Sequence, residues 1–238
     1  VMIGVSFVLF YLAIVKDYEP LLLLPIGAGC MLANLPLSPM IAEDGMLKVL
    51  YHMGVGNEMF PLLVFVGIGA LTDFGPLLEN PKFVLLGAAG QFGIFLTLLL
   101  ALLMGFTQKE AASIGIIGAI DGPTSIYVSG LLAPHMLGPI TVAAYSYMSL
   151  VPIIMPPVIY ALTTQKERSI VMPYAQRKIS RKTRIMFPII ITVLVGSLVP
   201  FATPLIGMLM LGNLMKESGA VERLTNASSN EIANTVRS

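Results

Sequence analysis

One carboxylate stands in the middle of an apolar stretch of this sequence, beside two residues that break helices. The stretch is GIIGAIDGPTSIYVSG, residues 115–130, in which Asp121 is followed by Gly122 and Pro123. A carboxylate at the depth of a membrane is costly, and such groups mark ion or proton pathways. Desolvation raises the pKa of an acid and a bound cation lowers it, so one carboxylate can hold a proton and a metal ion in turn. Asp121 is therefore the expected centre of an ion site.

The helix break beside Asp121 supplies further oxygen atoms. Proline removes an N–H donor and clashes with the preceding turn, and glycine allows unusual backbone angles. The freed carbonyl groups then need other partners, because lipid offers none. Hard cations prefer oxygen ligands, so the sequence predicts Na⁺ binding at Asp121, Gly122, Thr124 and Ser125. The alternative is that Asp121 caps the N-terminus of a half-helix, a role compatible with the first.

Other polar side chains in apolar segments are further candidates. Tyr145 and Tyr147 could relay a proton or bind the cation beside Asp121, or could anchor a helix at the membrane interface, where tyrosine is common. Asn213 could be a cation ligand or could hydrogen-bond between helices. Asp73 ends a short apolar run, and we expect it to cap the helix that follows.

The composition places these residues in a membrane. Hydrophobic residues make up 56% and charged residues 11% of the 238 residues, and the mean hydropathy is +0.85, whereas a soluble domain is about 25% charged. A net charge of +1 argues against a nucleic-acid partner. The single cysteine, Cys30, excludes an intrachain disulfide.

The apolar runs predict an all-α polytopic membrane protein. A spanning helix needs about 20 apolar residues. We treat residues 1–238 as a single transmembrane domain and expect it to be a fragment, because Val1 lies inside an apolar run and Ser238 inside a polar one. The expected spans are the visible end of one at residues 1–15, then 21–41, a short span at 59–72, 83–106, 138–163 and the split region 185–215, together with the broken segment 111–133.

A strongly basic connector sets the expected orientation. Residues 165–184 contain seven of the fourteen Lys and Arg residues and one acid, Glu167. Positive charge in short loops marks the cytoplasmic side, so we expect this basic loop to be cytoplasmic and to offer a docking face for a soluble partner. With Lys16 also inside, the loop returns to the cytoplasm only if residues 111–133 enter and leave on the same side. The charge pattern therefore favours a re-entrant hairpin broken at Asp121.

A faint internal repeat predicts an inverted-repeat, ion-transporter-like bundle with re-entrant broken helices. Residues 60–75 align with residues 203–219, and four identities pair Pro61 with Pro204, Leu62 with Leu205, Gly69 with Gly212 and Leu71 with Leu214. Many transporters are built from inverted repeats whose broken helices meet at the site. The second repeat then starts within residues 185–238, and its own broken segment is expected after Ser238.

Six segments resemble the β subunit of the sodium-translocating biotin-dependent decarboxylases, which include the oxaloacetate, methylmalonyl-CoA, glutaconyl-CoA and malonate enzymes. They follow the family's order over nearly the whole chain, and DGPTSIY is the most specific part. The segments are EPLLLLPIGAG (19–29), GIGALTDFGPLLENP (67–81), GAAGQFGIF (87–95), GIIGAIDGPTSIYVSG (115–130), AAYSYMSLVPII (143–154) and GNLMKESGAVERL (212–224).

The resemblance implies a reaction, a location and partners. In that family, a carboxyltransferase subunit moves CO₂ from the substrate to biotin on a carrier protein or domain. The β subunit then decarboxylates carboxybiotin, consumes a proton and exports Na⁺. The implied location is the prokaryotic cytoplasmic membrane. A small membrane-anchored subunit is a further implied partner, and a homo-oligomer is a further expectation.

The resemblance also assigns residues. Asp121 looks like the essential acid that alternates between Na⁺ and H⁺. Tyr147, with Tyr145 near it, looks like the tyrosine implicated in ion or proton movement, and Gly122 to Ser125 look like the re-entrant turn. The arginine that the family uses for carboxybiotin is expected beyond the end of this chain. The short connector 42–58 resembles the acyl-CoA and malonate members more than the oxaloacetate ones.

Two other functions fit the same residues less well. A secondary Na⁺-coupled carboxylate transporter could use similar broken helices without biotin, and a biotinylated partner would distinguish the two. A membrane scaffold for a soluble complex gives no reason for an acid beside a helix break.

Overall fold

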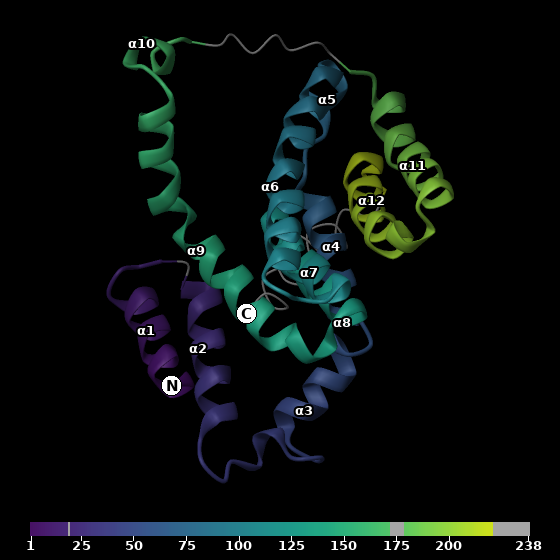
Figure 1. Cartoon of the computed structure of the whole chain (residues 1–238). Coiled ribbons are helices and arrows are strands. Elements are labelled where there is room, and N and C mark those ends of the chain that lie inside the picture. Colours follow the sequence, from purple (N-terminus) through teal and green to yellow (C-terminus); the bar gives the residue numbers. More distant parts are fainter. Residues whose placement is uncertain (19, 172–178, 221–238) are drawn as a thin grey trace.

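The computed structural model describes residues 1–18, 20–171 and 179–220, and every regular element within these ranges is helical (Figure 1). The first half contains α1 (Met2–Ile14), α2 (Pro20–Asn34), η1 (Pro39–Ile41), α3 (Met46–Leu50), η2 (Tyr51–Val55), α4 (Met59–Leu71), α5 (Gly75–Glu79), η3 (Pro81–Phe83) and α6 (Val84–Leu103). The second half contains α7 (Gln108–Gly115), η4 (Ile116–Ala119), α8 (Gly122–Leu132), η5 (Pro134–Met136), α9 (Leu137–Leu162), α10 (Gln165–Arg168), α11 (Arg181–Leu198), η6 (Pro200–Ala202) and α12 (Thr203–Ser218).

Breaks divide most of the apolar runs into helices too short to span a membrane. Within the described ranges, one helical stretch, Pro81–Leu103, is long and apolar enough to cross. The bent pair Leu23–Asn34 and Pro39–Val55, which turns by 100°, would make a second. Several elements have the extent that the sequence indicated: α4 has 13 residues, as expected for the short span 59–72, and α9 has 26 residues over Leu137–Leu162.

The connector 42–58 is more ordered than its polar composition indicated. It contains the short helix α3 and the π-helical turn η2, so the chain reaches α4 through helical backbone. Glu58 immediately before α4 has a φ of 64°, in the left-handed region. This turn brings the start of α4 against α8, which carries the acid singled out by the sequence.

The helices α4 and α12 cross at two glycines in a symmetric way. A Cβ added at Gly69 would overlap the carbonyl oxygen of Leu209, and one added at Gly212 would overlap that of Val66. Leu209 and Val66 each precede the glycine of their own helix by three positions, so equivalent residues meet, as in a two-fold contact. Gly69 and Gly212 are a pair that the sequence repeat aligned, and the structure brings the two repeated segments together.

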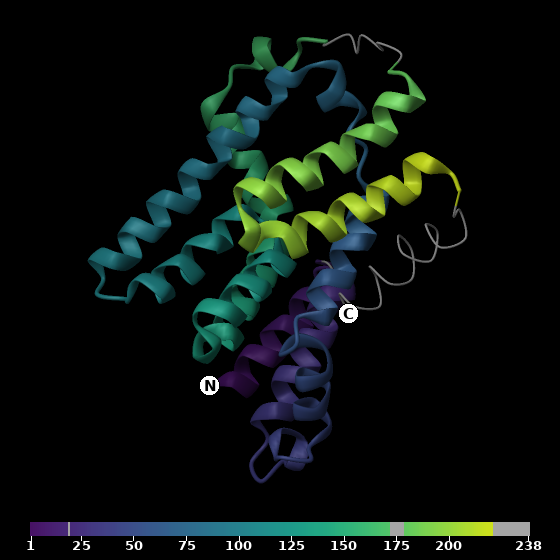
Figure 2. The same cartoon turned by 90° about the vertical axis from the view of Figure 1, so that its right-hand side faces the viewer.

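The remaining helices pack around this crossing. α11 lies along α12, as Figure 2 shows in green and yellow. α1 and α2 form a separate antiparallel pair with a small core of Leu9, Ala13 and Leu23, and α2 contacts α9. η3 and the first half of α6, residues 81–93, are exposed on every side, which leaves a large apolar surface for lipid or for further protein.

Candidate functional site

The broken segment forms a hairpin of two half-helices. α7 continues into the 3₁₀ turn η4 and stops at Ile120, whose φ of 58° lies in the left-handed region, where a β-branched residue is strained. Asp121 is extended, and α8 begins at Gly122 with Pro123 in its first turn, a position that suits proline. The break expected at Asp121–Gly122–Pro123 is confirmed.

The outer ends of this hairpin are joined by an ion pair. Glu110 Oε1, in the first turn of α7, lies 2.8 Å from Nε2 of His135, in the turn after α8. Hydrogen bonds from the backbone and hydroxyl of Thr107, and then the contact with His135, lower the pKa of Glu110 to about 2. The two ends of the broken segment therefore lie together, and α7 and α8 form a hairpin.

The Asp121 carboxylate caps α8. Its Oδ2 accepts a hydrogen bond of 3.2 Å from the backbone N–H of Thr124 and another from the Thr124 hydroxyl. The Ser125 hydroxyl donates to the Asp121 carbonyl oxygen at 3.0 Å. The capping role predicted as the alternative is confirmed, and Asp121, Thr124 and Ser125 form one cluster of oxygen atoms at a helix N-terminus.

Tyr145 of α9 closes one side of this cluster. Its ring is 8% exposed and lies so close to Gly122 that an added Cβ would be 2.5 Å from Cζ. A cavity of about 60 Å³ lies beside it, more than the roughly 10–15 Å³ that one water molecule needs. Its walls are Val55, Phe60, Pro61, Val64, Pro123, Ile126 and Tyr145.

The start of α4 is the part of this site that sequence reasoning missed. Phe60, Pro61 and Val64 are apolar, and residues 42–58 before them read as a polar connector. The repeat marked residues 60–75 as a segment of interest but gave no reason to place its first turn beside Pro123. Only the packing of α4 against α8 brings them together.

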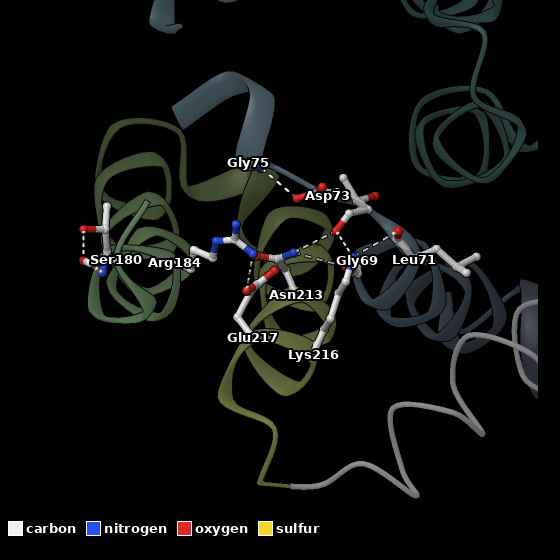
Figure 3. A network of polar contacts seen from close by, with 11 residues as sticks. Gly69, Leu71, Asp73, Gly75, Ser180, Arg184, Asn213, Lys216 and Glu217 are labelled. Carbon is white, nitrogen blue, oxygen red and sulfur yellow. Dashed lines mark hydrogen bonds and ion pairs between the residues drawn. The ribbon is translucent and has the colours of Figure 1, made fainter. Parts of the chain in front are cut away.

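The other predicted site residues lie apart from this cluster. Tyr147 is half-buried on α9 and, two positions from Tyr145, faces another side of the helix. Asn213 is 1% exposed, and its Nδ2 donates to the carbonyl oxygens of Thr72 at 3.1 Å and Gly69 at 3.4 Å (Figure 3). The interhelix role of Asn213 is thus confirmed. None of the described contacts joins it to residues 121–125.

A second break follows α4, and Figure 3 shows the contacts around it. The Asp73 Oδ1 accepts a hydrogen bond of 2.8 Å from the N–H of Gly75, the first residue of α5. The N-cap of α5 is Phe74, which has no side-chain cap, so Asp73 satisfies one N–H of the helix start from the residue before the N-cap. Lys216 Nζ of α12 donates to the carbonyl oxygens of Thr72 at 3.0 Å and Leu71 at 3.4 Å.

The basic loop borders this second break. Arg184 NH1 lies 3.9 Å from Glu217 Oε2, and Arg181 donates to the Ser218 carbonyl oxygen at 2.5 Å. Both arginines begin α11, which starts at Arg181. The centre of the loop, residues 172–178, lies outside the described residues.

Helical backbone throughout the described residues, with exposed apolar faces and the long apolar stretch Pro81–Leu103, is typical of the class of helical membrane proteins. The sequence narrows this class. Over residues 1–237 it matches the family described as "Na+-transporting oxaloacetate decarboxylase beta subunit", and the chain belongs to that family.

Curated relatives carry three different substrate names. The chain is 55% identical over 236 residues to "Methylmalonyl-CoA decarboxylase subunit beta" of Veillonella parvula, and 52% identical over 236 residues to "Glutaconyl-CoA decarboxylase subunit beta" of Acidaminococcus fermentans. It is 43% identical over 297 residues to "Oxaloacetate decarboxylase beta chain" of Klebsiella pneumoniae. Each match covers 99% of this chain but only 62%, 62% and 68% of the relative, so the chain spans about two thirds of their length.

Proposed function

We propose that this chain forms part of the membrane subunit of a decarboxylase sodium pump. The subunit decarboxylates carboxybiotin and couples the release of CO₂ to Na⁺ export and proton consumption. The observation that carries the proposal is Asp121 at the break of a hairpin of two half-helices, in a chain of the Na⁺-transporting family.

Within this proposal Asp121 alternates between Na⁺ and a proton. Its carboxylate accepts two hydrogen bonds from Thr124. Na⁺ would bind the oxygen atoms of Asp121, Thr124 and Ser125 and the backbone at Gly122, with the Tyr145 hydroxyl nearby. The contact of the Tyr145 ring with Gly122 supports this placement, because it brings α9 against the break. Tyr147 as a proton relay and Asn213 as a Na⁺ ligand remain parts of the proposal that require a movement of α9 or α12.

The carboxybiotin itself is supplied by a partner. Biotin would arrive on a carrier protein or domain loaded by a carboxyltransferase subunit, and a small membrane-anchored subunit would complete the complex. The basic loop, residues 165–184, is the proposed docking face and lies on the cytoplasmic side of a prokaryotic membrane in this orientation. Alignments of 236 residues with the two acyl-CoA relatives above, against 297 with the oxaloacetate relative, favour an acyl-CoA substrate for the complex.

The inverted repeat is part of the same proposal. The symmetric crossing of Gly69 and Gly212 supports a two-fold relation between residues 60–75 and 203–219. The first repeat carries the broken segment at Asp121, so the second should carry an equivalent broken segment in the part of the protein that follows. The complete ion site would then form where the two breaks meet.

One experiment tests the proposal and its competitor together. The full-length subunit is purified with its complex and reconstituted in vesicles, as wild type and as Asp121→Asn. We expect a biotinylated partner that avidin detects, Na⁺-dependent decarboxylation in the wild type, and loss of both decarboxylation and Na⁺ uptake in the variant. Normal coupled activity of Asp121→Asn contradicts the role of the acid. Na⁺-coupled carboxylate uptake without any biotinylated partner indicates a secondary transporter.

A further inference from the structure

The end of α4 exposes carbonyl oxygens that its own helix does not use. The helix stops at Leu71, and Thr72 is extended with a ψ of 133° before α5 begins at Gly75. The last carbonyl groups of a helix lack partners within it, and the helix dipole adds about half a negative charge there. Gly69, Leu71 and Thr72 therefore present main-chain oxygens at a negative helix end.

These oxygens are contacted by two groups from the same face of α12. The Asn213 amide donates to Gly69 and Thr72, and the Lys216 ammonium donates to Leu71 and Thr72 (Figure 3). Lys216 lies more than 140 residues along the chain from Thr72, so the contact is not a local cap. The close crossing at Gly69 and Gly212 fixes where this ammonium sits.

The Lys216 charge is matched by carbonyl oxygens and not by a described carboxylate. Among the ion pairs of the described residues, none involves Lys216, and the neighbouring acid, Glu217, faces Arg184 at 3.9 Å. A monovalent cation held by main-chain oxygens at a helix end has the same chemistry as a bound alkali ion, since hard cations prefer oxygen ligands.

We propose that the broken end of α4 is a monovalent-cation site that the Lys216 ammonium fills in this structure, and that Na⁺ competes with it. The ligands are the carbonyl oxygens of Leu71 and Thr72, while the Asn213 amide holds the neighbouring Gly69 oxygen. When Lys216 withdraws, Na⁺ takes its place. This site is separate from Asp121 and does not depend on the decarboxylase function proposed above.

The test removes the Lys216 ammonium in a protein in which Asp121 has already been neutralised. The full-length subunit is prepared as Asp121→Asn, as Asp121→Asn with Lys216→Met, and as Asp121→Asn with Lys216→Arg. ²²Na⁺ binding and the midpoint of thermal unfolding are measured in NaCl and in choline chloride of equal ionic strength. We expect saturable Na⁺ binding and a midpoint several degrees higher in NaCl for the Met variant. The Arg variant and the parent should bind Na⁺ at least about tenfold more weakly, because a tethered cation still fills the site.

Each other outcome also decides the matter. If Lys216 is only a helix cap, the Met variant unfolds earlier in both salts by the same amount and binds no additional Na⁺, which overturns the proposal. A Met variant that is recovered in NaCl but not in choline supports it, and one that is recovered in neither contradicts it. Lys182→Met, on α11, is the matched control and should behave as its parent. Strong Na⁺ binding by the Asp121→Asn parent would count against the Asp121 site. The difference in Na⁺ binding between the Lys216→Met and Lys216→Arg variants would still test the site at the end of α4.

Discussion

Two of the helix breaks in this chain contain an aspartate: Asp73 lies between α4 and α5, and Asp121 lies between η4 and α8. In both places a glycine and a proline follow, and in both the carboxylate accepts a hydrogen bond from the first turn of the next helix. The surroundings differ. Asp73 is exposed, and Lys216 covers the carbonyl oxygens before it. Asp121 is half-buried at the centre of a hairpin, beside Tyr145 and a small cavity.

The comparison separates what a local sequence specifies from what packing specifies. In both places an aspartate stands one or two residues before a Gly-Pro pair. The helix is interrupted there, and the carboxylate satisfies an N–H group that the start of the next helix leaves unpaired. Whether the acid can exchange a cation depends on which helix lies against it. Lys216 of α12 contacts the backbone just before Asp73, whereas Tyr145 of α9 packs against Gly122, just after Asp121.

The largest expected effect comes from neutralising the two acids in turn. Asp121→Asn should lower Na⁺-dependent decarboxylation in reconstituted vesicles by about 100-fold or more, in the range that a proton-transferring group contributes. Asp73→Asn should change it by less than about two-fold, because asparagine also caps helices. Equal losses in the two variants would show that both breaks belong to one site.

A second test separates the Asp73 break from the helix that covers it. Gly69→Ala or Gly212→Ala places a methyl group on a backbone carbonyl and should lower the free energy of unfolding by about 3 kcal/mol, at the upper end for overpacking. The double variant should lose less than the sum, since both changes separate the same pair of helices. Gly87→Ala, where the added Cβ meets nothing within 4 Å, is the control, and denaturant unfolding is the measurement.

A smaller loss of stability is expected when the glycine at each break is replaced by alanine. Gly122→Ala must displace the buried Tyr145 ring, 2.5 Å from the added Cβ, and should destabilise by about 1–3 kcal/mol. Gly75→Ala meets only the exposed Asp73 carboxylate at 2.9 Å and should cost less than about 1 kcal/mol. Thermal unfolding of both variants measures this, and Gly122→Ala with Tyr145→Leu should recover part of the loss.

The smallest effect concerns Glu110, which accepts hydrogen bonds from Thr107 at the start of α7 and also contacts His135 at the other end of the Asp121 hairpin. Glu110 has its pKa lowered from 4.5 to about 2 in the folded state. A carboxylate with a lowered pKa stabilises the fold above pH 4.5, and this stabilisation is lost as the pH falls from 4.5 towards 2. Hydrogen exchange of α7 and α8 should therefore increase over that window in the wild type. Glu110→Gln should flatten the dependence, and an unchanged dependence in this variant would show that another acid is responsible.

The sequence predicted the helix breaks and the aspartates that bind the helix starts, but not which other helices pack against them. Proline, glycine and aspartate act over one helical turn, so the breaks at Asp121 and after Asp73 could be predicted from a few residues. The position of Asn213 beside Thr72 depends on a crossing between residues more than 140 positions apart, and only the Gly69–Gly212 alignment pointed to it. The bend of 100° between Leu23–Asn34 and Pro39–Val55 was not predicted, because apolar composition alone does not show how a chain turns at a break.

The backbone contact between Gly69 and Gly212 also limits how this protein can change in length. One residue inserted into either helix would turn everything beyond it by about 100° around the axis. A side chain would then occupy the place where two main chains touch. The first half of α6, open on all sides, has no such limit from the described residues. Insertions and deletions among related sequences should therefore avoid the stretches around the two glycines and accumulate in the loops that connect them to the rest.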